Sequence, residues 1–256
     1  MKLITMIEKV KQMLPEPVEI GCVTIYNCDC IDFLRLSDNK QYDLAICDPP
    51  YGLFRWFSKD RKSGCTLSPQ EVLNIKKWDV VPNSEYFVEL NRVSKNRIVW
   101  GANHFIEHLG SCYGPIIWDK GRRWNTGKSK GFPLADGEFA WSSFKKPLRI
   151  CSYNETLKTA ERKTLQGRWH ETQKPIYLYR WLLERYAKPG QKILDTHLGS
   201  GTHAMACLEL GYELVACEIN KGYFDEAVIR IKEYTSSHKK IFNNLKNIEL
   251  TEVRLF

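Results

Sequence analysis

Apolar and polar positions alternate along the chain in short blocks that predict strands and helices by turns. Short apolar runs with strand character occur at residues 23–26, 42–47, 97–100, 115–118, 192–194 and 213–217. Helical spacing of apolar residues follows at 31–36, 85–93, 176–186, 203–210 and 223–234. Strands that alternate with helices are typical of parallel sheets, since parallel neighbours need a long crossover connection. The pattern predicts an α/β fold with a doubly wound, mostly parallel sheet.

The length and composition favour one domain with a single large core. The chain has 256 residues, of which 43% are hydrophobic. Its N-terminus lacks the apolar region of a secretory signal, and no apolar run reaches the length of a membrane span. The nine cysteines are an odd number and form no Cys-x-x-Cys pair, which favours free thiols. We therefore expect a cytoplasmic protein with no membrane association.

The positive charge is concentrated in one stretch. The formal net charge is +8, but residues 120–180 hold 14 Lys or Arg against 5 Asp or Glu, which is +9. Nine aromatic residues lie in the same stretch. A basic surface with interleaved aromatics suits a polyanion whose bases can stack, although a solvated lysine-rich surface fits the charge equally well.

A glycine-containing loop follows the strand at 192–194 and precedes a helix. Residues 195–202 read Asp-Thr-His-Leu-Gly-Ser-Gly-Thr, and Glu218 ends the next strand. Glycines at 199 and 201 let the backbone approach a ligand closely, and a carboxylate at 218 can accept hydrogen bonds from both ribose hydroxyls. The loop predicts a nucleoside-containing cofactor. A NAD-dependent Rossmann dehydrogenase would use the same unit, so the loop alone leaves the class open.

The tetrapeptide Asp48-Pro49-Pro50-Tyr51 is not needed by a dehydrogenase, but it suits an enzyme that methylates the amino group of a base. Two prolines end the strand at 42–47 and present the tetrapeptide at its carboxyl end. An exocyclic amine of a base is a poor nucleophile, because its lone pair is delocalised into the ring. The Asp48 side chain and the Pro49 carbonyl can both accept hydrogen bonds from this amine, which localises the lone pair and stabilises developing positive charge. Tyr51 offers a face on which a base swung out of the duplex can stack.

With these motifs the chain resembles the beta group of DNA amino-methyltransferases, in which Asp-Pro-Pro-Tyr precedes the cofactor loop. It looks like the small stand-alone type of phages and prophages. Residues 170–175, His-Glu-Thr-Gln-Lys-Pro, resemble a further family motif in which Glu171 replaces a proline. The resemblance implies S-adenosylmethionine as cofactor and N6 of adenine as the methyl acceptor. Its catalytic residues fall on Asp48, Pro49, Pro50 and Tyr51.

The cofactor residues that the resemblance implies are spread along the chain. Asp29 would read the cofactor adenine, Glu218 the ribose, and Thr172 and Lys174 the methionine end. The loop residues are Asp195, His197, Gly199, Ser200, Gly201 and Thr202. The family often has Pro-Phe where this chain has Thr196-His197, so His197 would replace the aromatic contact.

The basic stretch is assigned to DNA. We expect a catalytic domain at residues 1–119 and 169–256 and an inserted target-recognition region at 120–168. Its DNA-binding residues would be Arg122, Arg123, Lys128, Lys130 and Arg168. DNA is the expected partner of a monomer or homodimer, with a restriction-modification role as one setting for such an enzyme.

Other functions stay open at this point, among them a catalytically idle DNA-binding module, which the intact Asp48 and Glu218 argue against, and methylation of RNA or protein. Cytosine N4 methylation uses the same geometry but more often has serine in place of Asp48, and a dehydrogenase would leave the tetrapeptide unexplained. Methylation at cytosine C5 needs a cysteine nucleophile, typically after proline, and the chain has no Pro-Cys. The sequence His104-Phe105-Ile106-Glu107-His108 matches a zinc-peptidase pattern, but we read it as a helix surface and expect no metal.

Overall fold

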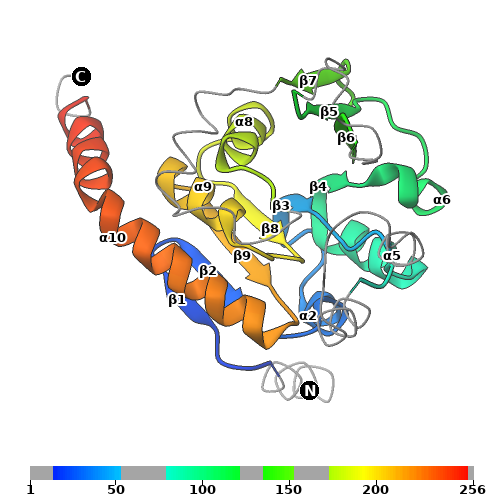
Figure 1. Cartoon of the computed structure of the whole chain (residues 1–256), viewed down its shortest axis with the longest axis horizontal. Coiled ribbons are helices and arrows are strands. Elements are labelled where there is room, and N and C mark those ends of the chain that lie inside the picture. Colours follow the sequence, from blue (N-terminus) through cyan, green and yellow to red (C-terminus); the bar gives the residue numbers. More distant parts are fainter. Residues whose placement is uncertain (1–13, 53–78, 122–134, 153–172, 253–256) are drawn as a thin grey trace, which may run out of the picture.

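The computed structural model describes residues 14–52, 79–121, 135–152 and 173–252, with the side chains described up to residue 237. In these ranges one twisted sheet forms the centre of the protein, and helices cover both of its faces (Figure 1). An α/β fold with a mostly parallel sheet is therefore confirmed.

The strands of the described residues form one sheet of nine, in the order β1-β2-β9-β8-β3-β4-β6-β5-β7. The pairs β2–β9, β9–β8, β8–β3, β3–β4 and β5–β7 are parallel, whereas β1–β2, β4–β6 and β5–β6 are antiparallel. The strands are β1 Val18–Ile20, β2 Val23–Tyr26, β3 Tyr42–Cys47, β4 Ser94–Trp100, β5 Ile116–Asp119, β6 Gly137–Ser142, β7 Arg149–Cys151, β8 Lys192–Asp195 and β9 Glu213–Cys217.

Residues that alternate along the central strands belong to two separate cores. In β3, Leu44 and Ile46 pack on one side of the sheet, and Ala45 and Cys47 pack on the other. Because successive side chains of a strand point to opposite faces, a strand buried on both sides is apolar throughout. This explains why the strand at 42–47 is apolar at every position except Asp43.

Two groups of helices complete these cores. Apolar side chains of α8, α9 and α10 belong to the first core, and those of α2 and α5 belong to the second. The long helix α10 crosses the side of the sheet near β1 and β2 (Figure 1). The helices are α2 Cys30–Leu36, α5 Ser84–Val93, α6 Ile106–Leu109, α8 Ile176–Tyr186, α9 Thr202–Leu210 and α10 Lys221–Glu252, with a 3-10 turn η1 at Ala102–His104.

Part of the predicted target-recognition region belongs to the sheet. Strand β6 pairs with β4 and β5, and β7 pairs with β5, so residues 137–142 and 149–151 are built into the same layer as β3. These strands escaped the sequence analysis because β6 carries a charged residue, Glu138, in a half-buried first part, and β7 is short and partly exposed. The rest of the basic stretch, at 122–134 and 153–172, lies outside the described residues, and the domain boundary stays a prediction.

The zinc-peptidase pattern does not form one helix. Buried Phe105 separates η1 from α6, so His104 and His108 lie in different elements. Among the described residues, no group of three His, Cys, Asp or Glu side chains is placed to hold a metal ion. No helix in the described ranges is long and apolar enough to cross a membrane.

Candidate active site

Strands β3 and β8 are direct parallel neighbours, with Leu44 opposite Ile193 and Ala45 opposite Leu194. Their carboxyl ends therefore meet at one edge of the sheet. The tetrapeptide at 48–51 follows β3 and the loop at 195–202, called the cofactor loop below, begins at the end of β8. Two motifs far apart in sequence are thus brought together at the edge where doubly wound sheets bind ligands.

The Asp48 carboxylate is held by two side chains. The Tyr51 hydroxyl donates a hydrogen bond to Oδ1 over 2.5 Å, and the Lys174 ammonium lies 2.5 Å from Oδ2. The Asp48 side chain keeps 22% of its surface exposed, so a ligand can still reach it. Burial raises its pKa, although Lys174 opposes this shift. Burial and the neighbouring carboxylate of Asp48 also raise the pKa of Tyr51, which keeps its hydroxyl protonated as a donor.

The Tyr51 ring is packed on the segment after β4. It stacks on His104 with a centroid distance of 5.2 Å and an interplanar angle of 18°, and meets the edge of Phe105 at 5.9 Å. A Cβ atom on Gly101 would lie 2.1 Å from the ring, and Gly101 has a φ of +69°. Only glycine fits here, because any side chain would displace the ring.

Lys174 joins Asp48 to a second carboxylate, that of Glu138 at the start of β6. Its ammonium lies 2.9 Å from Glu138 Oε2, and Lys120 lies 2.5 Å from Glu138 Oε1. These four residues, Asp48, Lys174, Glu138 and Lys120, are called the charge network below. Burial opposes the charged form of Lys174, but Asp48 and Glu138 raise its pKa overall. Burial works against the Glu138 carboxylate too, yet the two lysines lower its pKa to about 2.

Glu138 and Lys120 were missed by the sequence analysis, and Lys174 was assigned only to the cofactor. No local pattern marks Glu138, because its partners are 18 positions before it and 36 positions after it in the sequence. The structure brings Lys174 to the tetrapeptide. Its role at the methionine end of the cofactor stays a prediction.

The first residue of the cofactor loop is fixed by a buried histidine. Asp195 Oδ1 accepts a hydrogen bond from the backbone N–H of His197 over 3.0 Å, and Oδ2 lies 2.8 Å from His203 Nδ1. Tyr179 of α8 stacks on the His203 ring with a centroid distance of 4.5 Å. His203 sits inside α9, where helical spacing gives no sign of a loop contact, so the sequence analysis did not select it.

The Glu218 carboxylate, at the end of β9, connects the cofactor loop to the segment that follows β9. Oε2 accepts a hydrogen bond from the Gly199 N–H over 3.0 Å, and Oε1 accepts one from the Asn220 N–H over 2.8 Å. Burial raises its pKa. Each carboxylate oxygen has two lone pairs, so acceptor capacity for ligand hydroxyls remains. A Cβ atom on Gly199 would meet only a carbonyl oxygen at 3.9 Å. Open space beside this acceptor is what a ribose needs, and the residues fit the predicted cofactor.

The second half of the cofactor loop is held in place by helix α10. Gly201 has a φ of +78°, and a Cβ atom there would lie 3.0 Å from the Ile231 side chain. Arg230 of α10 donates to the Ser200 carbonyl, and the Ser200 hydroxyl lies 3.3 Å from that of Thr202. Helix α10 therefore holds the turn from which α9 begins.

His197 belongs to a neutral hydrogen-bonded network beside the loop. Its Nδ1 lies 2.9 Å from the Thr196 hydroxyl, which in turn lies 2.7 Å from the Tyr86 hydroxyl, and its Nε2 lies 3.8 Å from Cys30 Sγ. Burial lowers the pKa of His197 to about 4. The ring is therefore an uncharged aromatic group at neutral pH, as the phenylalanine common in the resembled family would be.

The remaining predicted site residues divide into two sets. Asp29 is exposed and caps α2, because its Oδ1 accepts a hydrogen bond from the Ile31 N–H over 2.7 Å. It lies after β2, next to β9, at the same edge of the sheet as Glu218. The residues outside the described ranges are Arg122, Arg123, Lys128, Lys130, Arg168 and Thr172.

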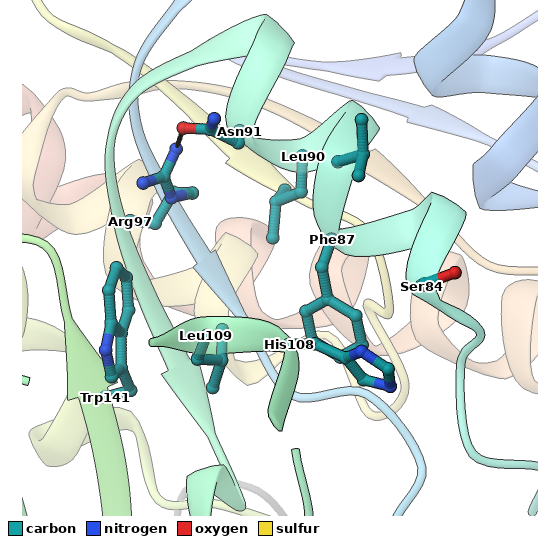
Figure 2. A pocket seen from close by; sticks show the side chains of 9 residues that line it. Ser84, Phe87, Leu90, Asn91, Arg97, His108, Leu109 and Trp141 are labelled. Atoms are coloured by element: carbon teal, nitrogen blue, oxygen red, sulfur yellow. Dashed lines mark hydrogen bonds between the residues drawn. The ribbon is translucent and has the colours of Figure 1, made fainter. Parts of the chain in front are cut away.

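A separate cavity of about 300 Å³ lies between α5, α6 and the strands β4 and β6 (Figure 2). Arg97 and Asn91 face each other at one end, and Phe87 and His108 stack at the other. The described residues that line it include none of the predicted site. The cavity is thus separate from the edge formed by β3 and β8.

Comparison with known proteins shows the family of the chain. The model of the N6/N4 methyltransferase family, described as DNA methylase, matches residues 53–229, more than half of the chain. The chain therefore belongs to this DNA methylase family, and a dehydrogenase is excluded.

Individual relatives cover most of the chain at low identity. It is 24% identical to the type II methyltransferase M2.DpnII of Streptococcus pneumoniae, over 81% of this chain and 89% of the relative. It is also 24% identical to the type II methyltransferase M.HinfI of Haemophilus influenzae, over 86% of this chain and 71% of the relative.

Solved structures share the fold. The PvuII DNA methyltransferase, described as cytosine-N4-specific, matches with a TM-score of 0.53 and 14% identity over 86% of this chain and 93% of its own. The M1.HpyAVI–SAM complex matches with a TM-score of 0.51 and 18% identity over 81% of this chain and 99% of its own.

Proposed function

We propose that the protein methylates the N6 amino group of adenine in DNA, with S-adenosylmethionine as the methyl donor. The observation that carries this proposal is the position of Asp48. Its carboxylate lies at the end of β3, beside the cofactor loop that follows the neighbouring strand β8. A hydrogen-bond acceptor for an amine and a loop for a nucleoside cofactor thus share one edge of the sheet.

The cofactor side is built to bind a nucleoside. The Glu218 carboxylate would accept hydrogen bonds from the ribose hydroxyls, Gly199 would allow close approach, and Asp29 would accept from the adenine. The neutral His197 ring can pack against a positively charged ligand without repulsion. When bound, S-adenosylmethionine supplies a methyl group on a sulfonium centre that a nitrogen nucleophile can attack.

The acceptor side is built to bind an amine. Asp48 and the Pro49 carbonyl would accept the two hydrogens of the exocyclic NH₂ group, which localises the nitrogen lone pair and stabilises the charge that grows during transfer. Tyr51 holds Asp48 Oδ1 in place by its hydroxyl, while its ring contributes an aromatic wall for a flipped base.

The carboxylate at 48 supports adenine over cytosine. In the resembled family, enzymes acting on cytosine N4 more often have serine at this position. The order of the motifs, with Asp48 before the cofactor loop, supports membership of the beta group. We assign DNA contacts to the basic residues Arg122, Arg123, Lys128, Lys130 and Arg168.

Methylation of DNA of known sequence by the purified protein tests the proposal. Single-molecule sequencing would map modified positions after incubation with S-adenosylmethionine, and we expect them at adenines in one short sequence context. NAD in place of S-adenosylmethionine serves as the control and should yield unmodified DNA. Modification confined to N4 of cytosine would replace N6 by N4, and unmodified DNA in every sample would overturn the proposal.

A further inference from the structure

Glu138 is a half-buried carboxylate that the proposed chemistry does not use. Its side chain is only 19% exposed, and Oε2 is fully buried. It stands at the start of antiparallel β6, whose last residues pair with the end of β4. Two lysines, Lys120 and Lys174, contact its two oxygens. A buried charge without such partners would be costly, so the position of Glu138 is tied to the lysines.

The partner of greatest consequence is Lys174. This side chain is only 3% exposed, and its ammonium lies between Asp48 Oδ2 at 2.5 Å and Glu138 Oε2 at 2.9 Å. It also lies 3.3 Å from the Tyr51 hydroxyl and 5.3 Å from the centre of the Trp100 ring. The ammonium is therefore fixed between two carboxylates of which only Asp48 belongs to the tetrapeptide.

The balance of charges sets what Asp48 can do. If Glu138 were neutral, Lys174 would be left with Asp48 as its sole anionic partner in the charge network. The ammonium already contacts Asp48 Oδ2 at 2.5 Å, and without the charge of Glu138 its whole attraction would fall on Asp48 and compete with an incoming amine for the Asp48 oxygens. With Glu138 charged, the positive charge of Lys174 is shared, and Asp48 keeps acceptor strength for a ligand.

We propose that Glu138 is a positioning residue for methyl transfer, which shares the positive charge of Lys174 with Asp48 and so keeps the Asp48 carboxylate available as an acceptor for the amine. This inference rests on the proposed function, because it assigns Asp48 to that amine. Glu138 acts through Lys174 and does not itself contact the base.

A neutral isosteric variant, Glu138→Gln, tests this role. We expect kcat for DNA methylation to fall by about tenfold to a hundredfold, since small displacements of a catalytic group carry costs of this size. The Kd for S-adenosylmethionine, measured by calorimetry, and the KM for DNA should stay within about twofold, because neither ligand is bound by Glu138. Glu138→Asp, which restores the charge on a shorter chain, should recover part of kcat.

Glu213→Gln is the matched control. Glu213 also pairs with a lysine, Lys192, at 2.6 Å, but at the opposite ends of the strands β8 and β9. The Glu213→Gln variant should therefore have the kcat of the wild-type protein. A thermal melt of each variant shows whether it is folded at the assay temperature.

A double variant separates positioning from a merely structural role. Lys174→Met removes the group through which Glu138 acts, so adding Glu138→Gln to it should lower the single-turnover rate by less than about twofold further. Full multiplication of the two losses would overturn the proposal, and so would a normal kcat for Glu138→Gln in an otherwise active enzyme. If the wild-type protein itself transferred no methyl group to DNA, the proposed function would fail first, and this inference with it.

Discussion

The cofactor loop and the charge network lie at the same edge of the sheet but are held in place differently. On the cofactor side, backbone N–H groups bind both carboxylates: His197 donates to Asp195, and Gly199 donates to Glu218. One side-chain contact, from His203 Nδ1 to Asp195 Oδ2, adds to them. Side chains hold the charge network, in which Lys174 contacts both Asp48 and Glu138. The geometry of the cofactor side is therefore set largely by the backbone. The acceptor side depends on ion pairs between side chains, which a single substitution can change.

Loss of the acceptor carboxylate should have the largest effect. We expect Asp48→Ala to lower kcat by about a hundredfold to a thousandfold, because a hydrogen-bond partner of the transition state is removed. The Kd for S-adenosylmethionine should change by less than about twofold, since Asp48 faces the acceptor.

The control for this variant lies on the same strand. Asp43 is at the opposite end of β3, where it pairs with Lys95 at 2.7 Å. Asp43→Ala should keep normal kcat. Near-normal turnover of Asp48→Ala at saturating cofactor would contradict the division between the two sides.

Loss of the cofactor carboxylate should act in the opposite way. We expect Glu218→Ala to raise the Kd for S-adenosylmethionine by about tenfold to a hundredfold, because hydrogen bonds to a charged acceptor are lost. Turnover at saturating cofactor should fall much less. Calorimetry measures the first quantity and steady-state kinetics the second. A lower kcat with unchanged affinity would reverse the assignment of Glu218.

The neutral histidine of the cofactor side predicts a pH dependence of stability. Burial lowers the pKa of His197 to about 4 in the folded protein, below the 6.5 of an exposed histidine. The unfolded chain therefore binds the proton more readily, and stability that is present above pH 6.5 is lost as the pH falls toward 4.

His197→Phe should remove this dependence. Between pH 7.5 and 5.0 we expect the wild-type protein to lose about 1 to 2 kcal/mol more unfolding free energy than the variant. Urea denaturation at both pH values measures the difference. Equal losses would show that the ring titrates normally in the folded protein.

The smallest expected effect concerns the basic stretch. Changing Arg122 and Arg123 together to alanine should flatten the slope of log DNA affinity against log salt by about one to two units, because fewer counterions are released on binding. Cofactor affinity should stay the same. Lys95→Ala with Lys192→Ala removes the same charge from the starts of β4 and β8 and should leave the slope unchanged. If only the Lys95 and Lys192 changes flattened the slope, the DNA-binding surface would lie near the starts of β4 and β8 and not in the basic stretch.

Most of the fold could be predicted because its signals are local. The apolar run at 42–47 and the helical spacing at 176–186 are each contained in one element, and the structure places both as predicted. The three-residue strands β1 and β7 and the strand β6 were missed. In β7, Arg149 and Ile150 are exposed, so apolar burial gives no periodic signal there.

Site residues with a local sequence signal were likewise predicted, and those that depend on contacts between distant segments were missed. Glycines at 199 and 201 and the acid at 218 lie within one strand-loop-helix-strand unit, and sequence analysis selected them. The link between Asp48 and Glu138 passes through Lys174, and it exists only because β6 enters the sheet beside β4. His203 was missed for a related reason, since a buried polar residue within α9 looks like any helix position until Asp195 is seen beside it.

The central claim is that the acceptor is an exocyclic amine, that of adenine. It is tested most directly by mass spectrometry of nucleosides from DNA treated with the protein and S-adenosylmethionine carrying an isotopically labelled methyl group. We expect the label in N6-methyladenine, and about a hundredfold to a thousandfold slower labelling when Asp48→Ala replaces the wild-type protein. Label in N4-methylcytosine would correct the base while keeping the amine. Label in 5-methylcytosine would contradict the account, because hydrogen-bond acceptors at Asp48 and Pro49 have nothing to polarise at a carbon atom.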